Sequence, residues 1–192
     1  IVNQGKVENK GVELTLGYNF YSIFGSKINY APQINFSYNK SIVTDLGGET
    51  VIPSGTDLYA GRGFLGRTML REEGQPLNSF YLYHFDGIWQ TGEETQAAIY
   101  GAKPGDAKMR DTDNNGILDN RDKYHAGTPD PTTTLGFANN FYYKNFEFKA
   151  FFQGVFGNRV YNQTRLILEN PDLGFLNNLS PAVLDRWTET NP

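Results

Sequence analysis

The feature that most constrains the fold is an alternation of large apolar and small polar residues along four long segments. Residues 12–20 and 27–39 carry Val, Leu, Ile, Phe, Tyr or Pro at every second position, with mostly amides, hydroxyls and small residues between them. Residues 133–143 and 146–156 repeat the pattern, with Phe151 and Val155 out of phase. A period of two places side chains alternately on the two faces of a β-strand. The sequence therefore predicts long antiparallel strands, each with an apolar and a polar face.

The connections between these segments are either very short or very long. Lys144-Asn145 is a two-residue hairpin turn, and Tyr21–Ser26 is a short link between the first two strands. Residues 44–131 are instead rich in Gly, Thr, Asp and Asn. Within them, Ser79–Gln90 resembles a strand and Glu93–Tyr100 a short helix. The sequence thus predicts two hairpins separated by one long excursion.

Two further local features predict structure. Pro32 lies inside the second strand and has no N–H to donate, which favours an edge position or a bulge there. Ser180-Pro181 has the pattern of a helix N-cap followed by a first-turn proline, and predicts a helix over Ala182–Trp187. Residues 157–179 show no periodicity and are expected to be irregular.

Alternation alone leaves two fold classes open, because a soluble β-sandwich alternates as well. Strands of ~9–13 residues, Tyr and Phe near strand ends, and short turns alternating with long loops favour a β-barrel in lipid. The chain has no run of ~18 apolar residues, so the sequence predicts no transmembrane helix. Its net charge of −4 argues against nucleic acid as a partner. The absence of cysteine excludes disulfides and thiolate metal sites.

An acidic loop lies between the two hairpins. Side-chain oxygens fall at positions 1, 3, 5, 9 and 12 of a twelve-residue stretch, with Gly116 at position 6 to allow a sharp turn. The spacing predicts a structural calcium site, although a solvated turn rich in Asp, Asn and Gly remains the alternative. Strands rather than helices are expected to flank it, which argues against a calcium sensor. The candidate ligands, Ile117 contributing its backbone carbonyl, are Asp111, Asp113, Asn115, Ile117, Asp119 and Asp122.

Other chemistry-bearing residues do not form a catalytic set. His84 and His125 are the two histidines, and a solvated loop position is expected for His125. The adjacent carboxylates of Glu72-Glu73 face opposite ways on a strand, which argues against a glycosidase pair. Aromatic side chains that could stack on sugar rings are more often packed or interfacial; they are Tyr81, Tyr83, Trp89 and Trp187. We therefore expect a protein that is not an enzyme.

Several motifs, in order along the chain, resemble the SusC/RagA family of TonB-dependent outer-membrane transporters. Asn9-Lys-Gly-Val-Glu-Leu14 opens a strand, and Gly74-Gln-Pro-Leu-Asn-Ser-Phe-Tyr81 leads into Phe85-Asp-Gly-Ile-Trp-Gln90. Gly105-Asp-Ala-Lys108 precedes the acidic loop. Further matches are Gly127-Thr-Pro-Asp-Pro131, Gly136-Phe, Tyr143-Lys-Asn-Phe146, Phe151-Phe-Gln-Gly154 and Arg186-Trp-Thr-Glu-Thr-Asn-Pro192.

The resemblance implies a barrel of roughly 22 strands with a plugged lumen, in the outer membrane of Bacteroidetes-type bacteria. Residues 1–192 would form a partial barrel domain from its C-terminal half, an open antiparallel sheet with long extracellular loops and without the plug domain. The family implies import of glycans or peptides, energised through TonB, with a SusD-like surface lipoprotein. The alternative is a soluble calcium-stabilised β domain of an adhesin or carbohydrate-binding protein.

In such a barrel, both short links would be periplasmic turns. The strand from residue 27 then rises and the strand from residue 133 descends, so residues 44–131 contain an even number of membrane crossings. We expect zero or two crossings, with the acidic loop on the extracellular side.

Overall fold

The computed structural model describes residues 5–60, 63–171 and 178–191. The chain divides into two compact units. The first comprises Ile1–Val51, Arg71–Asn78 and Gly127–Val160, and the second comprises Ile52–Leu70, Ser79–Ala126 and Tyr161–Pro192. Each unit is built from antiparallel strands, and the long excursion predicted from the sequence forms most of the second.

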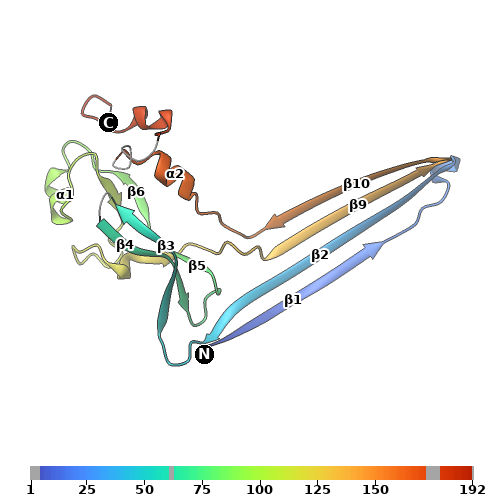
Figure 1. Ribbon diagram of the computed structural model, residues 1–192, viewed down its shortest axis with the longest axis horizontal. Coiled ribbons are helices and arrows are strands. Elements are labelled where there is room, and N and C mark those ends of the chain that lie inside the picture. Colours follow the sequence, from blue (N-terminus) through green and yellow to red (C-terminus); the bar gives the residue numbers. More distant parts are fainter. Residues whose placement is uncertain (1–4, 61–62, 172–177, 192) are drawn as a thin grey trace. The chain divides into compact units, whose positions relative to one another are not determined.

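The first unit is a four-stranded antiparallel sheet in the order β1-β2-β9-β10 (Figure 1). Strands β9 (Thr133–Tyr143) and β10 (Phe146–Phe156) have the bounds that the sequence predicted. Strand β1 (Lys6–Gly17) starts and ends earlier than predicted, and β2 (Ile28–Asp45) continues further. Because β2 pairs directly with β9, no strand from residues 46–132 lies between them in this sheet. The number of crossings is therefore zero, one of the two predicted values.

Both short links lie at one end of this sheet. Ile28, the first residue of β2, pairs with Tyr143, the last residue of β9. The link before β2 contains the 3-10 turn η1 (Ile23–Gly25), and Lys144 adopts φ 51° in the hairpin turn. Asp45 and Thr133, where the long excursion leaves and returns, belong to the opposite end.

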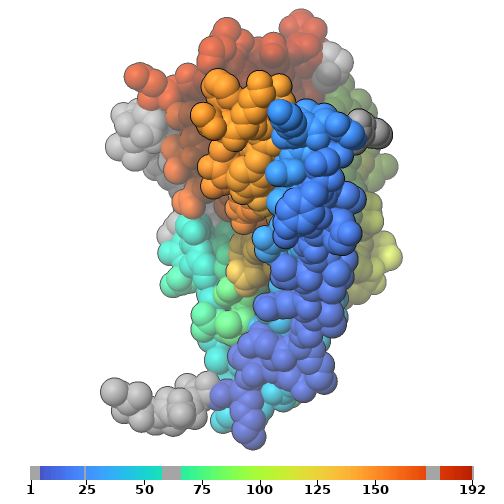
Figure 2. All heavy atoms as spheres, turned by 90° about the vertical axis from the view of Figure 1, so that its right-hand side faces the viewer, coloured from blue at the N-terminus to red at the C-terminus, as the bar shows by residue number. Residues whose placement is uncertain are grey.

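One face of the sheet is apolar and open. Among its side chains, Val12 is 63% exposed, Ile34 44% and Phe152 63%. In the space-filling view, β1 (dark blue) lies at the surface along its length (Figure 2). A soluble sandwich would bury such a face against a second sheet. The exposed apolar face therefore favours the wall of a β-barrel over a soluble β-sandwich.

Five aromatic rings form a row near the short links, from two residues that follow β1, across β2 and β9, to β10. Ring centroids are 4.7 Å apart for Tyr18 and Phe20, 6.1 Å for Phe20 and Tyr30, 4.4 Å for Tyr30 and Phe141, and 6.2 Å for Phe141 and Phe148. Aromatic belts of this kind sit at the membrane–water interfaces of outer-membrane barrels. The row is the girdle that the clustering of Tyr and Phe predicted.

One polar side chain, Asn139, interrupts the apolar face. It pairs with Pro32 in the register of β2 and β9, and it is 8% exposed. The Tyr30 hydroxyl donates a 2.7 Å hydrogen bond to Asn139 Oδ1. A polar group facing hydrocarbon needs an internal partner, so Tyr30 allows an amide to remain on this face.

Pro32 does not mark an edge or a bulge, contrary to the prediction. It lies in β2, between β1 and β9, and neither register shifts there. The Pro32 carbonyl accepts a hydrogen bond from Tyr18 N, so the nitrogen of Pro32 faces the same neighbour. Tyr18 follows Gly17, the last residue of β1. The N–H group that proline lacks would therefore point to the place where β1 ends. For this reason a central strand can contain the proline there.

The far end of β2 is covered by the segment Arg71–Asn78 of the same unit. Beyond the end of β9, Val43 N donates to the Gln75 carbonyl and Gly74 N donates to the Val43 carbonyl, each at 2.9 Å. Glu73 Oε1 accepts a further hydrogen bond from Leu46 N at 3.1 Å. Val43 and Leu46 are buried there, with 1% and 5% of their surface exposed. The Gly-Gln-Pro-Leu motif thus satisfies backbone groups of β2 that β9 does not reach.

Among its described residues, the second unit contains two small sheets and short helices. Strands β3 (Val51–Ala60), β4 (Gly63–Glu72), β5 (Ser79–Tyr83) and β8 (Lys123–His125) form one sheet in that order. Strands β6 (Phe85–Ile88) and β7 (Ala107–Met109) form the other. The helical elements in the described part of this unit are α1 (Glu94–Ile99), η2 (Asn120–Asp122), α2 (Gln163–Leu168) and η4 (Pro181–Asp185).

The sequence predicted this unit only in part. Helix α1 was expected, whereas the predicted strand Ser79–Gln90 is split into β5 and β6. Ser180 caps η4 through a hydrogen bond from Ala182 N, but that element is a 3-10 helix and ends at Asp185. Strands β3 and β4 and helix α2 were not predicted. No helix among the described residues is long and apolar enough to cross a membrane.

Substitutions on the two faces of β10 test the orientation of the sheet. Phe152 lies on the apolar face, midway between Phe148 and Phe156, and Gln153 lies on the polar face. Because a lysine facing lipid at the bilayer centre costs about 2–4 kcal/mol, we expect Phe152→Lys to impair assembly of the full-length protein, as measured by heat-modifiable mobility on gels. Gln153→Lys is the matched control and should assemble normally. Equal assembly of the two variants would contradict the orientation.

Candidate functional site

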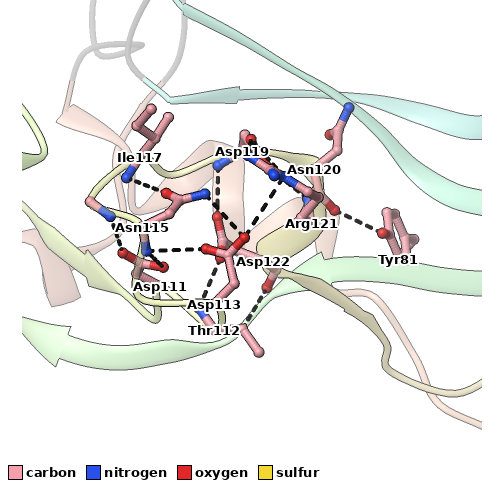
Figure 3. A network of polar contacts seen from close by, with 11 residues as sticks. Tyr81, Asp111, Thr112, Asp113, Asn115, Ile117, Asp119, Asn120, Arg121 and Asp122 are labelled. Atoms are coloured by element: carbon pink, nitrogen blue, oxygen red, sulfur yellow. Dashed lines mark hydrogen bonds and ion pairs between the residues drawn. The ribbon is translucent and has the colours of Figure 1, made fainter.

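The acidic loop connects β7 to β8, so strands flank it as the sequence predicted. Its second half folds into η2, whose N-cap is Asp119. The loop turns at Asn114, with φ 55°, and at Gly116, with φ 79°. Both are left-handed conformations that Asn and Gly adopt more easily than other residues. The turn brings the two ends of the loop together (Figure 3).

Three of the predicted ligands converge. Carboxylate oxygens of Asp111, Asp113 and Asp122 all lie within 4.8 Å of one another. The other predicted side-chain ligands are held in hydrogen bonds of their own. Asn115 Oδ1 accepts from Ile117 N at 2.7 Å, and the carboxylate of Asp119 binds the guanidinium of Arg121 at 2.8 Å.

Backbone amides and a tyrosine hold Asp111 in place. Its Oδ2 accepts hydrogen bonds from Gly116 N at 2.8 Å and from the Tyr100 hydroxyl at 3.2 Å. Desolvation raises the pKa of Asp111, but the hydrogen bonds from Gly116, Tyr100 and Asn115 outweigh it and hold the pKa below its usual range. Asp111 is therefore charged at neutral pH. The contact of Tyr100 with Asp111 could not be predicted from the sequence, because Tyr100 precedes the loop at the end of the predicted helix.

Asp122 is the buried end of the loop. Only 1% of its surface is exposed. Its Oδ1 accepts from Thr112 N and its Oδ2 from Asp119 N, both at 2.8 Å. The second bond belongs to a capping box, in which the Asp119 side chain accepts from backbone N–H groups of η2 and the Asp122 side chain accepts from the N–H of Asp119. Asp122 thus ties the start of the loop to its end.

The charge of the three converging carboxylates is offset in part by Arg121. Arg121 Nε lies 3.8 Å from Asp113 Oδ2, and the arginine side chain is 66% exposed. The hydrogen bonds that Arg121 donates to Asp119 lower the pKa of that carboxyl. Clustered carboxylate oxygens are the donors that a hard cation such as calcium prefers. Asp111, Asp113 and Asp122 therefore suit a cation, whereas Asp119 is engaged with Arg121.

The aromatic residues considered for sugar stacking are mostly engaged in packing. Trp89 is 6% exposed, and Lys108 Nζ lies 4.3 Å from the centre of its ring. Trp187 donates its indole N–H to Gln90 Oε1 at 3.1 Å, and Gly105 passes so close to its ring that a Cβ there would lie 2.6 Å away. Tyr81 donates its hydroxyl to the Asn120 carbonyl, and Lys123 lies over the Tyr83 ring.

His125 forms a pair with a serine, which the sequence did not predict. It lies in β8 rather than in a solvated loop, and its Nδ1 is 2.7 Å from Ser79 Oγ. Ser79 is 1% exposed, so its hydroxyl is not accessible to a substrate. The pair joins β5 to β8 beside the acidic loop.

Known proteins with similar sequences are receptors of one kind. TonB-dependent receptor P3 of Formosa agariphila is 35% identical over 198 residues, which take in 100% of this chain and 19% of the relative. TonB-dependent receptor P26 of the same organism is 34% identical and covers 99% of this chain. TonB-dependent receptor SusC of Bacteroides thetaiotaomicron is 26% identical over 83% of the chain. The chain spans about a fifth of the length of these relatives or less. No protein-family model matches it.

Solved structures give the same fold. The RagAB peptide transporter superposes with a TM-score of 0.73 at 22% identity, over 98% of this chain and 19% of the other. The RagAB peptide importer in its open-open state superposes with a TM-score of 0.69 at 24% identity, over 97% of this chain and 19% of the other. The likeness of fold includes both units of the chain.

Removing the buried carboxylate tests the architecture of the acidic loop. Asp122→Ala leaves the N–H groups of Thr112 and Asp119 without an acceptor, which costs about 1–3 kcal/mol for each unsatisfied group. We expect faster hydrogen exchange at these two amides, by about tenfold or more, in the full-length protein. Arg121→Ala removes only exposed ion pairs, worth about 0–1 kcal/mol, and serves as the control. Unchanged protection at Thr112 and Asp119 would contradict this role for Asp122.

Proposed function

Because the chain belongs to the SusC/RagA family of TonB-dependent receptors in the outer membrane of Bacteroidetes-type bacteria, we propose that it forms part of the barrel wall and an external loop region of a nutrient importer. The exposed apolar face of β1, β2, β9 and β10 is the observation that supports a place in the barrel wall. A face of exposed aliphatic and aromatic side chains, ended by a row of rings, suits contact with lipid rather than water. The soluble adhesin-like alternative would require a covering layer over this face.

The polar face of the same sheet would line the lumen. It carries Glu13, Thr15, Asn35, Ser37 and Gln153, which border a shallow hollow of about 310 Å³. Thr15 Oγ1 donates to Asn35 Oδ1 at 3.1 Å, so hydroxyls and amides are already in contact along the face. Hydroxyls and amides of this kind suit a water-filled interior through which polar solutes pass.

The imported solute would be an oligosaccharide or a peptide, taken up with energy from TonB and with a SusD-like surface lipoprotein as partner. Support comes from the relatives: one is SusC, and the solved structures with this fold are of a peptide transporter. The short links at one end of the sheet would then be periplasmic, and the long excursion from Asp45 to Thr133 would be extracellular.

Deletion of the gene in its native strain tests the import function. We expect loss of growth on a particular glycan or peptide source, and recovery with the wild-type gene. The Phe152→Lys variant, which should not assemble, is expected not to restore growth. An affinity-tagged receptor should also co-purify with a surface lipoprotein. Normal growth of the deletion strain on every glycan and peptide source tried would refute the proposal.

The acidic loop would hold a structural calcium ion within this importer. The three converging carboxylates, Asp111, Asp113 and Asp122, would supply the negative charge, and the ion would reduce their mutual repulsion. Asn115, Asp119 and the Ile117 carbonyl remain candidates for the remaining coordination. Extracellular calcium modules bind with a Kd on the order of 10⁻⁴–10⁻³ M, which suits a site that pins a loop rather than a sensor.

Calorimetry of the full-length receptor tests the ion. We expect calcium binding at millimolar concentration or below in the wild type, and loss of binding in the double variant Asp111→Ala, Asp113→Ala. The strands should be unaffected, so the thermal transition of the barrel should not change. Glu49→Ala, which removes an exposed carboxylate outside the loop, is the control and should bind as the wild type. Absence of binding heat in the wild type at millimolar calcium would exclude the site.

A further inference from the structure

Two lysines face each other at the border of the apolar face that lies away from the aromatic row. The register pairs Lys10 of β1 with Lys40 of β2. The next pair on the same face is Val12 with Tyr38. Because partners in an antiparallel pair share a face, both lysines point to the lipid side. Like charges placed directly opposite each other destabilise a sheet, so this pair needs another explanation.

Nearby carboxylates neutralise only one of the two charges. Lys10 Nζ lies 2.9 Å from Glu8 Oε2, and the lysine side chain is 77% exposed. Lys40 is exposed and has no ion-pair partner within the described part of the chain. Lys6, the other lysine at this end of β1, is paired with Asp45 at 3.2 Å. One positive charge is therefore left on the lipid side of the sheet.

The height of the pair matches a membrane interface. From Tyr30 in the aromatic row to Lys40, β2 advances by about 33 Å at a rise of about 3.3 Å per residue. With a strand tilt of about 40°, the distance along the membrane normal is about 25 Å, the height of the apolar band of an outer-membrane barrel. If the aromatic row marks one interface, Lys10 and Lys40 mark the other. The row lies by the short links, so the lysines lie on the extracellular side.

From these observations we propose that Lys10 and Lys40 bind the phosphate of an anionic lipid head group in the outer leaflet. A phosphate between the two ammonium groups relieves their repulsion and forms charge-assisted hydrogen bonds with both. The flexible lysine stems extend along apolar surface and keep their charged ends at head-group level. Tyr38, 41% exposed beside the pair, is placed to contact the adjoining part of the lipid. The site rests on the membrane location of the sheet and is independent of the imported solute.

Lipid binding to the purified full-length receptor tests the proposal. Native mass spectrometry in detergent would measure binding of diphosphoryl lipid A, of phosphatidylcholine and of inorganic phosphate, each added separately. Basic residues near an anionic surface contribute about fivefold each, so we expect the double variant Lys10→Gln, Lys40→Gln to lose about 25-fold in affinity for lipid A. Binding of phosphatidylcholine should be weaker and should not depend on the two lysines.

Lys149→Gln is the matched control, because Lys149 lies on the polar face of β10, paired with Glu147 at 2.9 Å. It should bind lipid A as the wild type does. Heat-modifiable mobility should show that all variants are folded. The proposal is overturned if the double variant binds lipid A as tightly as the Lys149→Gln control. It is also overturned if inorganic phosphate displaces lipid A at equal concentration, which would indicate a site for free anions.

Discussion

Backbone pairing between β2 and β9 joins segments that lie far apart in the chain, from Ile28 with Tyr143 to Tyr38 with Thr133. Without it, the molecule would contain two separate hairpins, each with a narrow apolar face. With it, the aromatic rings of Tyr18 and Phe20, which follow β1, line up in one row with those of β2, β9 and β10, and both short links lie at one end of the sheet. The presence of both short links at the same end of the sheet follows from this single junction.

The sheet of the first unit leaves a whole apolar face exposed, whereas the second unit buries several of its large apolar side chains. The first exposes Val12, Phe148 and Phe152 on a continuous face, whereas the second buries Phe80 and Trp89, with 5% and 6% exposed. An apolar face in contact with lipid loses nothing by remaining uncovered, but in water the same face would drive association. The difference fits a wall in lipid for the first unit and a conventionally folded loop region in water for the second.

The sequence predicted the structure well where one local pattern was sufficient. The bounds of β9 and β10 followed from alternation around a two-residue turn. The prediction of an edge or a bulge at Pro32 was wrong, because the sequence does not show that the N–H group that proline lacks would face the end of β1. Strands β3 and β4 were missed because their alternation is broken by residues such as Pro53 and Gly55. In the acidic loop, spacing indicated Asp111, Asp113 and Asp122 but not that Arg121 would engage Asp119.

The long excursion leaves from Asp45 and returns at Thr133, and near its ends Asn39 N donates to the Thr132 carbonyl. Its two ends are thus fastened to neighbouring strands whatever lies between them. Doubling the length of a closed loop adds only about 0.6 kcal/mol of entropic cost. Insertions, deletions or wholesale replacement within this region can therefore accumulate over evolution with little penalty to the sheet. Receptors built in this way can exchange the excursion while the strands that carry it stay the same.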